Sequence, residues 1–223
     1  DRGYHAAVLA ALSSGSHLID TAAHFRHQWS ERAVGRALRS AFASGLARRD
    51  EVVVCTRGGD IPFDGPPSNA RAWVQAHYID TGLITWSDIV AQNVMRPAFL
   101  RRQIEQSLDN LGLETIDLYY LHNPESQLRG VSRPECFDRL AACAEELEFA
   151  VSAGMIRAYG VATWDAFRLP PEEPLAVNLE DVVQTAVAVG GTRHHFRAVQ
   201  LPLNLAMSEA LVRPTQRVGQ HTV

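Results

Sequence analysis

Polar side chains follow four short apolar runs of the chain, and together they could perform acid/base chemistry. The four are Asp20, Arg57, His122 and Gln200. A histidine can donate or accept a proton near neutral pH. An arginine stays charged and can hold a negative oxygen. If they meet in space, a histidine flanked by an Asp–Arg pair could polarise a carbonyl or position a hydroxyl.

The elements that must position these side chains alternate between strand and helix. Such alternation predicts parallel βαβ units and an α/β fold of the (β/α)8 TIM-barrel type, in which the strand ends share one mouth. A doubly wound sheet is the alternative, but no glycine-rich turn follows an expected strand. Ser30 is predicted to be the N-cap of its helix. We expect strands at 18–22, 51–56, 117–122, 156–163 and 196–204, and helices at 3–15, 30–45, 97–111, 134–153 and 180–189.

The long connection over residues 57–95 is rich in glycine, proline and aromatic residues, with one short helix expected near 86–92. A βα connection of this length is predicted to form a substrate lid. Its aromatic residues either line the pocket or anchor the loop to the barrel. The candidates for lining it are Trp73, Tyr78 and Trp86, with Trp164 as a further wall.

Several motifs lie in a recognisable order. They are Asp20-Thr21-Ala22-Ala23-His24-Phe25, Ser30-Glu31 with Gly35-Arg36-Ala37-Leu38, Gln106-Ser107-Leu108-Asp109-Asn110-Leu111, Ile116-Asp117-Leu118-Tyr119-Tyr120-Leu121-His122 and Gly154-Met155-Ile156-Arg157-Ala158-Tyr159-Gly160-Val161. In this order the chain resembles the aldo-keto reductases from residue 3 to about residue 205. The resemblance implies one barrel domain over residues 1–223.

The same resemblance implies that this barrel is incomplete, because the family's first strand and last two βα units find no counterpart here. Two explanations are open. The sequence is the ordered part of a longer protein, or it is a partial barrel whose edges are covered by a partner, such as a second copy, because open strand edges are unstable alone.

The resemblance implies hydride transfer from NADPH to a carbonyl, with a tyrosine as proton donor. A lysine paired with an aspartate lowers the pKa of that tyrosine, and a histidine orients the carbonyl. The aspartate position holds Asp20 and the histidine position holds His122. The tyrosine position, however, holds Phe25, and the lysine position holds Arg57. All 21 basic Lys/Arg positions of the chain are arginine, so a lysine amine is excluded from the chemistry.

The positions that the resemblance assigns to NADP(H) are partly changed. Thr163, after Ala162, replaces the second residue of a Ser-Asn pair that holds the nicotinamide carboxamide. Gln200 and Asn204 match the family, whereas Leu203 stands where an aromatic ring commonly stacks on the nicotinamide. NADP(H) is thus the implied cofactor, with Thr163, Gln200 and Asn204 as its contacts.

Three hypotheses on function follow. The first is a small-molecule enzyme that performs dehydration, isomerisation or cyclisation, with His122 as acid/base and Arg57 as oxyanion clamp. The second is an NADPH-dependent carbonyl reductase in which His122 donates the proton. The third is a binding or scaffold protein. His24 is the weakest catalytic candidate, because its position beside Phe25 predicts a side chain that points away from the mouth.

The charge and composition of the chain indicate which classes of binding partner to expect. A net charge of -4 with scattered arginines does not indicate a nucleic-acid surface, and no apolar run is long enough to span a membrane. The three cysteines have no metal-ligand spacing, which is typical of a reduced, cytoplasmic protein. His194-His195 has no third ligand nearby, so no metal site is predicted. The expected partner is a small-molecule substrate.

Overall fold

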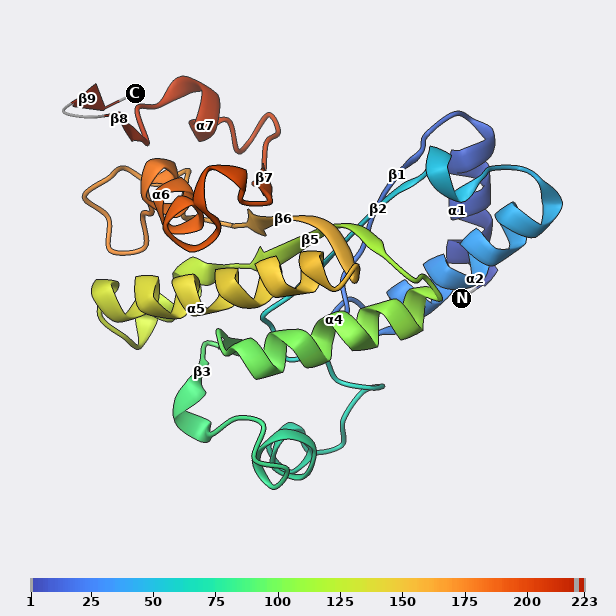
Figure 1. The fold of residues 1–223 in the computed structure, drawn as a ribbon, viewed down its shortest axis with the longest axis horizontal. Coiled ribbons are helices and arrows are strands. Elements are labelled where there is room, and N and C mark those ends of the chain that lie inside the picture. Colours follow the sequence, from blue (N-terminus) through green and yellow to red (C-terminus); the bar gives the residue numbers. More distant parts are fainter. Residues whose placement is uncertain (1, 219–220, 223) are drawn as a thin grey trace.

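The computed structural model describes residues 2–218 and 221–222. A five-stranded parallel sheet, in the order β1-β2-β5-β6-β7, forms its centre (Figure 1). The strands are β1 (Leu18–Asp20), β2 (Val53–Gly58), β5 (Ile116–His122), β6 (Ile156–Ala162) and β7 (Phe196–Gln200). The main helices are α1 (Arg2–Ser13), α2 (Trp29–Ser44), α4 (Pro97–Leu111), α5 (Arg133–Ser152) and α6 (Leu179–Gly190).

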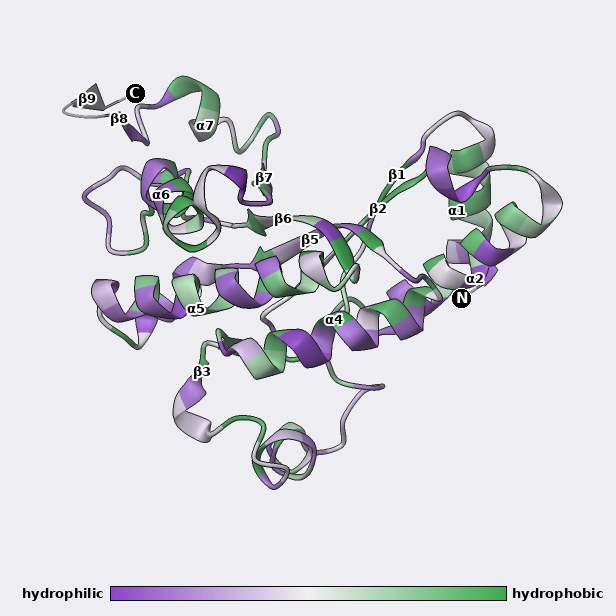
Figure 2. Cartoon of the chain, viewed as in Figure 1, coloured by the Kyte–Doolittle hydropathy of each residue, from purple (hydrophilic) through white to green (hydrophobic). Residues whose placement is uncertain are grey.

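The helices pack in chain order along the outer face of the sheet, α1 on α2, α2 on α4, α4 on α5 and α5 on α6. Side chains that alternate along the strands supply this core, among them Val54, Tyr119 and Val161. Figure 2 shows hydrophobic strands beside helices that carry both apolar and polar faces. The arrangement is an α/β fold of the (β/α)8 barrel type, with β1 and β7 as edge strands in the described residues.

On the inner face of the sheet, residues that are in register across neighbouring strands form layers, here called levels, as in parallel barrels. Arg57 is in register with Tyr120, and Tyr120 with Gly160. One level higher, His122 is in register with Ala162, and Ala162 with Gln200. Side chains two residues apart point to the same face. On this same face Cys55, Tyr120 and Ala162 form a small apolar cluster beside the polar residues, with Leu118 and Ala198 packed against it.

Helix α2 begins differently from the prediction. Gln28 precedes it in a left-handed conformation, and the helix starts at Trp29. The prediction of Ser30 as N-cap is therefore wrong, because its hydroxyl lies in the first turn and accepts a hydrogen bond from Thr21 Oγ1. The expected last strand is also too long, since β7 ends at Gln200 rather than near Asn204.

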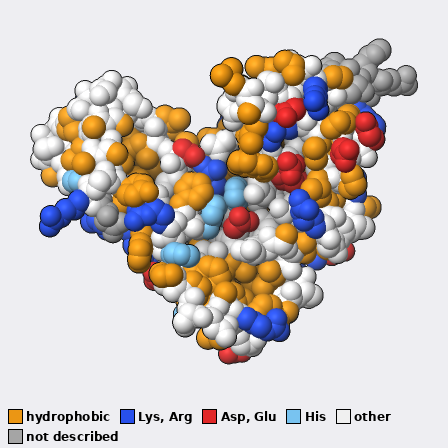
Figure 3. All heavy atoms as spheres, turned by 180° about the vertical axis from the view of Figure 1, so that it is seen from behind, with side chains coloured by type: hydrophobic (Ala, Val, Ile, Leu, Met, Phe, Trp, Pro, Cys, Tyr) orange, Lys and Arg blue, Asp and Glu red, His pale blue; other side chains and the backbone are white. Residues whose placement is uncertain are grey.

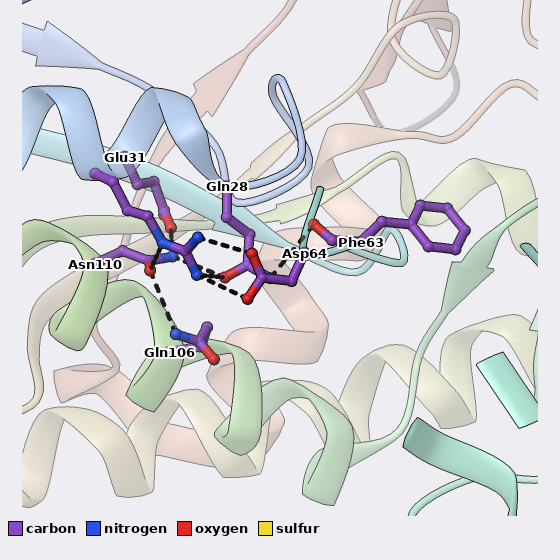
Figure 4. Close-up of polar contacts among 7 residues, drawn as sticks. Gln28, Glu31, Phe63, Asp64, Gln106 and Asn110 are labelled. Carbon is purple, nitrogen blue, oxygen red and sulfur yellow. Dashed lines mark hydrogen bonds and ion pairs between the residues drawn. The ribbon is translucent and has the colours of Figure 1, made fainter. Parts of the chain in front are cut away.

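An outer polar network joins α2 to β2 and α4. It consists of Gln28, Glu31, Arg32, Thr56, Asp64 and Asn110. Figure 4 shows Gln28, Glu31, Asp64 and Asn110 of this network. Thr56 Oγ1 donates to Glu31 Oε1 at 2.6 Å, and Asn110 Nδ2 donates to Glu31 Oε2 at 2.8 Å. The Arg32 guanidinium donates to both carboxylate oxygens of Asp64. Glu31 is fully buried, so these hydrogen bonds replace those that water would make.

The connection between β2 and α4 has more structure than the single helix expected there. It contains α3 (Ala70–Val74), η2 (Gln75–Ile79), η3 (Trp86–Asp88), β3 (Ile89–Val90) and β4 (Asn93–Val94). A small core of its own, which includes Ile61, Val74 and Ile84, packs on Phe99 of α4. The shorter remaining elements are η1 (Arg49–Glu51), η4 (Pro124–Arg129), η5 (Gly191–Arg193), α7 (Glu209–Val212), β8 (Arg217–Val218) and β9 (His221–Thr222).

Cys55, Cys136 and Cys143 are buried and free, and Cys136 and Cys143 lie on helix α5. Among the described residues, none of the helices has both the length and the apolar character to cross a membrane.

Candidate active site

A pocket of about 400 Å³ opens at the carboxyl ends of the parallel strands. Figure 3 shows histidine side chains with basic and acidic neighbours in a hollow between the lobes of the molecule. Of the residues predicted for the site, seven line this pocket: His24, Phe25, Arg57, His122, Thr163, Trp164 and Gln200. The carboxyl ends of the strands thus meet at one mouth, as a parallel barrel requires.

Asp20 and Arg57 form an ion pair at the floor of the pocket. The guanidinium donates a short hydrogen bond to Asp20 Oδ2, and its Nε donates to the carbonyl of Thr21 at 3.3 Å. Gln200 Nε2 reaches the same Asp20 oxygen at 3.2 Å from the opposite edge strand. This contact shows that the sheet curves enough to bring the ends of β1 and β7 within side-chain reach.

Phe25 occupies the position where the resemblance places the tyrosine. Its ring lies 5.4 Å from the Arg57 guanidinium carbon, and it is 39% exposed. A phenyl ring offers the cation its π face but has no proton to donate. Three consecutive left-handed residues, Arg26, His27 and Gln28, follow it. Such backbone is costly for non-glycine residues and is found mostly at functional sites.

His122 is bound to an acid that sequence reasoning missed. Its Nδ1 lies 2.9 Å from Asp60 Oδ2, and Asn93 Nδ2 donates both to Asp60 Oδ1 and to the His122 carbonyl. Burial acts to raise the pKa of the Asp60 carboxyl, but the hydrogen bond and charge of His122 outweigh it and lower that pKa. An ionised carboxylate only accepts, so His122 Nδ1 carries the proton and Nε2 is the nitrogen left for a substrate.

His24 points into the pocket, contrary to the expectation that it turns away. Residues 22–25 form a turn in which the Phe25 amide donates to the Ala22 carbonyl. Neighbouring side chains in a turn do not alternate faces as they do in a strand. The His24 ring stacks on His122 with 4.7 Å between centroids. Burial, with the nearby charge of His122, lowers the pKa of His24 to about 4.

Tyr120 is the nearest alternative source of a phenolic proton, one level below His122. It is buried in the small apolar cluster of the inner face and is not among the residues that line the pocket. Burial raises its pKa to about 12. Tyr120 therefore does not replace the tyrosine that Phe25 has lost.

The positions predicted for the cofactor are not brought together fully. Gln200 lies in the pocket, while the Thr163 hydroxyl oxygen is buried and has no hydrogen-bond partner among the described residues. Asn204 lies beyond β7, where its side-chain oxygen accepts from the amides of Ala206 and Met207. Its side chain stabilises its own turn rather than the pocket.

Trp164 forms an open wall of the pocket and is 55% exposed. Its backbone amide donates to Glu125 Oε1 at 2.9 Å, as does that of Asp165 at 3.1 Å. Glu125 is buried, which raises the pKa of its carboxyl. It is therefore the anchor of the loop that carries Trp164.

The other aromatic residues of the predicted lid lie away from this pocket. Trp73 and Tyr78 pack on the small core around Phe99 and line a separate groove of about 630 Å³ beside α4. Trp86 packs on the same core and donates to Gln75 Oε1 at 3.0 Å. These contacts match the alternative in which the aromatic residues anchor the loop.

Known proteins are similar to this chain in sequence. Residues 4–170 match the model of the Aldo/keto reductase family. The chain belongs to this family. Human aldo-keto reductase family 1 member C2 is 27% identical over 168 residues, which cover 71% of this chain and 41% of that protein. The D-threo-aldose 1-dehydrogenase of Pseudomonas sp is 31% identical over 157 residues, covering 69% of this chain and 42% of the relative.

Solved aldo-keto reductase structures show the same fold. An aldo-keto reductase of the silkworm Bombyx mori superposes with a TM-score of 0.57 at 20% identity, covering 92% of this chain and 47% of that one. The aldose reductase of Schistosoma japonicum gives a TM-score of 0.54 at 19% identity, covering 92% and 56%. The chain spans about two-fifths of the length of the curated family members it matches.

Asp60 could have been found from the sequence. It stands three residues after Arg57, in the loop that follows the same strand, and an acid just beyond a barrel strand is placed for chemistry. Its pairing with His122, 62 residues away, could not be found in this way.

Proposed function

We propose that this member of the aldo/keto reductase family is a small-molecule enzyme in which an Asp60–His122 dyad performs acid/base chemistry without the family's tyrosine. The observation that supports this is the 2.9 Å contact between His122 Nδ1 and Asp60 Oδ2 at the wall of the pocket. A histidine oriented by a carboxylate is the arrangement that makes an efficient general base or acid.

Arg57 is proposed as the oxyanion clamp of the same reaction. It lines the pocket, and its guanidinium is held between Asp20 and the ring of Phe25. A cation held in place before the reaction stabilises a developing negative oxygen without reorganising. The side chain is only 8% exposed, which limits competition from water.

These groups fit a substrate with a carbonyl or hydroxyl group. His122 Nε2 would remove a proton from the carbon beside a carbonyl, and the resulting enolate oxygen would face Arg57. Return of that proton to a different carbon gives an isomerisation, and loss of a β-hydroxyl as water gives a dehydration. Attack of the enolate on a second carbonyl of the same molecule gives a cyclisation.

A reductase that uses NADP(H) is the second candidate, and membership of the family favours it. When bound, the cofactor would supply the hydride. Of the positions that the resemblance assigns to the nicotinamide, Thr163 and Gln200 line the pocket, whereas the side chain of Asn204 stabilises its own turn. The described residues therefore bring together only part of a nicotinamide site, and no step is assigned through the cofactor.

Two assays separate these candidates. Small hydroxy-carbonyl compounds are incubated with the protein in D₂O, with a chelator and without nucleotide, and deuterium incorporation is followed by NMR. The proposal predicts exchange that His122→Gln abolishes and His27→Gln leaves unchanged. His27 is the matched control, since it is in the same loop as His24 but does not line the pocket.

The second assay is a titration with NADPH followed by tryptophan fluorescence. Binding at micromolar concentration together with carbonyl reduction would replace the acid/base proposal with the reductase. The double substitution Phe25→Tyr with Arg57→Lys tests the cofactor site more directly, because it restores the family's tyrosine and lysine. Carbonyl reduction by this variant but not by the parent protein would show an intact cofactor site. Absence of both exchange and reduction would leave the binding or scaffold hypothesis.

A further inference from the structure

Three side chains with metal-binding atoms converge at the pocket from three separate parts of the chain. His24 follows β1, Asp60 follows β2 and His122 ends β5. One ligand atom from each lies within 4.8 Å of the other two. The strand ends of the barrel bring them together, so the local spacing that sequence analysis searches for is absent.

Two of the three groups, His24 and Asp60, are in the chemical state that a metal requires. Burial and neighbouring charge lower the pKa of His24 to about 4, so its imidazole is neutral at physiological pH. The pKa of Asp60 is held below its ordinary value, so its carboxylate is charged. Metal ligands must be deprotonated, and these two meet that condition before an ion arrives.

The groups that orient these ligands are also present. Asn93 donates to Asp60 Oδ1 at 3.1 Å and to the His122 carbonyl at 2.8 Å. Gln127 in turn donates to the Asn93 side-chain oxygen at 2.9 Å. Hydrogen bonds of this kind fix the direction of metal ligands and contribute to affinity. Asn93 and Gln127 are both fully buried, which makes this support rigid.

The surrounding charges favour a cation. Arg57 is a positive side chain whose charge acts on His24, and Asp20 forms an ion pair with it. The carboxylate of Asp60 is then the remaining negative charge beside the two imidazoles. The Asp60 carboxylate would partly neutralise a dication bound there. The Arg57 guanidinium would repel that ion less, because Asp20 already pairs with it.

We propose that His24, Asp60 and His122 form a site for a divalent transition-metal ion, with Zn²⁺ as the natural occupant. Two imidazoles and one carboxylate are a donor set of catalytic zinc sites, which leave a position open for water or substrate. His24 and His122 line the pocket, so the open position faces it. The ion replaces the proton between His122 Nδ1 and Asp60, and that proton moves through the solvent to Nε2, so that His122 binds the ion as a neutral imidazole.

The inference uses the same pocket as the proposed function but does not depend on its chemistry. With the proton present, His122 and Asp60 form the acid/base dyad. With an ion present, Nδ1 is a ligand, and the ion can polarise a carbonyl oxygen as a Lewis acid. The two states exclude each other, so zinc is expected to inhibit proton exchange.

For the test, the full chain is first freed of any purification tag and of metal. It is then titrated with ZnCl₂ and followed by calorimetry, and separately with Co²⁺ and followed by visible absorption. We expect one ion per chain at micromolar affinity or tighter. Visible Co²⁺ bands of a nitrogen/oxygen site should appear and should be displaced by Zn²⁺.

His24→Gln and Asp60→Asn should each weaken zinc binding by at least about tenfold. His27→Gln is the matched control and should bind as the parent does. Circular dichroism in the presence of chelator verifies that each variant is folded, and His24→Gln keeps the test available if Asp60→Asn does not fold. Millimolar affinity, or equal affinity in His24→Gln and His27→Gln, would overturn the inference.

The proposed function is judged separately. Its exchange assay contains a chelator, and the titration contains no substrate. Zinc binding without exchange would support the metal site and reject the dyad chemistry, whereas exchange without zinc binding would do the reverse.

Discussion

Thr56 and Arg57 are neighbours on β2, yet they belong to two polar regions with opposite properties. Thr56 points toward the helices and donates to Glu31 in the outer polar network. Arg57 points to the inner face, where it pairs with Asp20 and lines the pocket. The alternation of side chains along a strand separates the two regions by one residue.

The two regions differ in how fully their polar atoms are satisfied. In the outer polar network both oxygens of Glu31 accept hydrogen bonds, and Arg32 donates to both Asp64 and Asn110. In the pocket, His122 binds Asp60 through Nδ1 and leaves Nε2 for a substrate. A satisfied network stabilises one structure, whereas a site must keep donors and acceptors for its ligand.

Among the predictions, His122→Gln is expected to have the largest effect, a loss of proton exchange in the pocket. Loss of a general acid or base costs about 10²- to 10⁴-fold in rate. The measurement is the rate of proton exchange into the substrate, with His27→Gln as control. A His122→Gln protein that still exchanges at the parent rate would remove the dyad from the mechanism.

A pair of arginine substitutions compares the two regions directly. Arg57→Gln should lower the exchange rate by about 10²- to 10³-fold, the range found when an oxyanion donor is removed. Arg32→Gln should leave the rate unchanged and lower the free energy of unfolding by about 1 kcal/mol or less, because its partner Asp64 is half exposed. Denaturant unfolding and the exchange assay on both variants measure the two effects. Equal rates in the two variants would contradict the distinction.

Gly35→Ala tests the packing beneath the outer polar network. A Cβ atom at this position would lie 2.5 Å from the Asn110 carbonyl oxygen, so α2 and α4 would have to move apart. We expect a loss of about 1–3 kcal/mol in the free energy of unfolding, as for other overpacked sites. Gly3→Ala in α1 meets no atom within 4 Å and is the control, for which we expect no loss. Thermal and denaturant unfolding measure both.

The smallest expected effect is the pH dependence of Glu31. Burial raises the pKa of this carboxyl in the folded protein above its ordinary value of 4.5. The folded state therefore binds this proton more tightly than the unfolded state. The resulting stability is complete below pH 4.5 and is lost as the pH rises through the folded pKa.

Glu31→Gln removes this titration while keeping hydrogen-bonding groups at the same place. The free energy of unfolding of the variant relative to the parent should rise with pH above 4.5 and then level off. Urea unfolding at several pH values measures the difference. A difference that stays constant with pH would mean that Glu31 ionises no less easily in the folded protein than in the unfolded chain.

The repeating pattern of the fold could be predicted because it rests on local physical rules. Helix α4 begins at Pro97 and ends before Gly112 as its N1 proline and C-terminal glycine indicate. The start of α2 could not be predicted, because the left-handed backbone of Gln28 displaces the cap from Ser30. The hairpin of β3 and β4 was missed for a related reason, since its turn uses Ala91 and Gln92 in left-handed conformations that such residues rarely adopt.

The sequence by itself determined which chemical groups this protein can use. It contains no lysine, it has Phe25 at the tyrosine position, and it places Asp20, Arg57 and His122 at strand ends. Only the tertiary structure decided how these groups combine. His24 stacks on His122, and His122 forms a hydrogen bond with Asp60. Both contacts join residues that are far apart in the chain. Such contacts depend on strand register and loop direction, which local residue patterns do not encode.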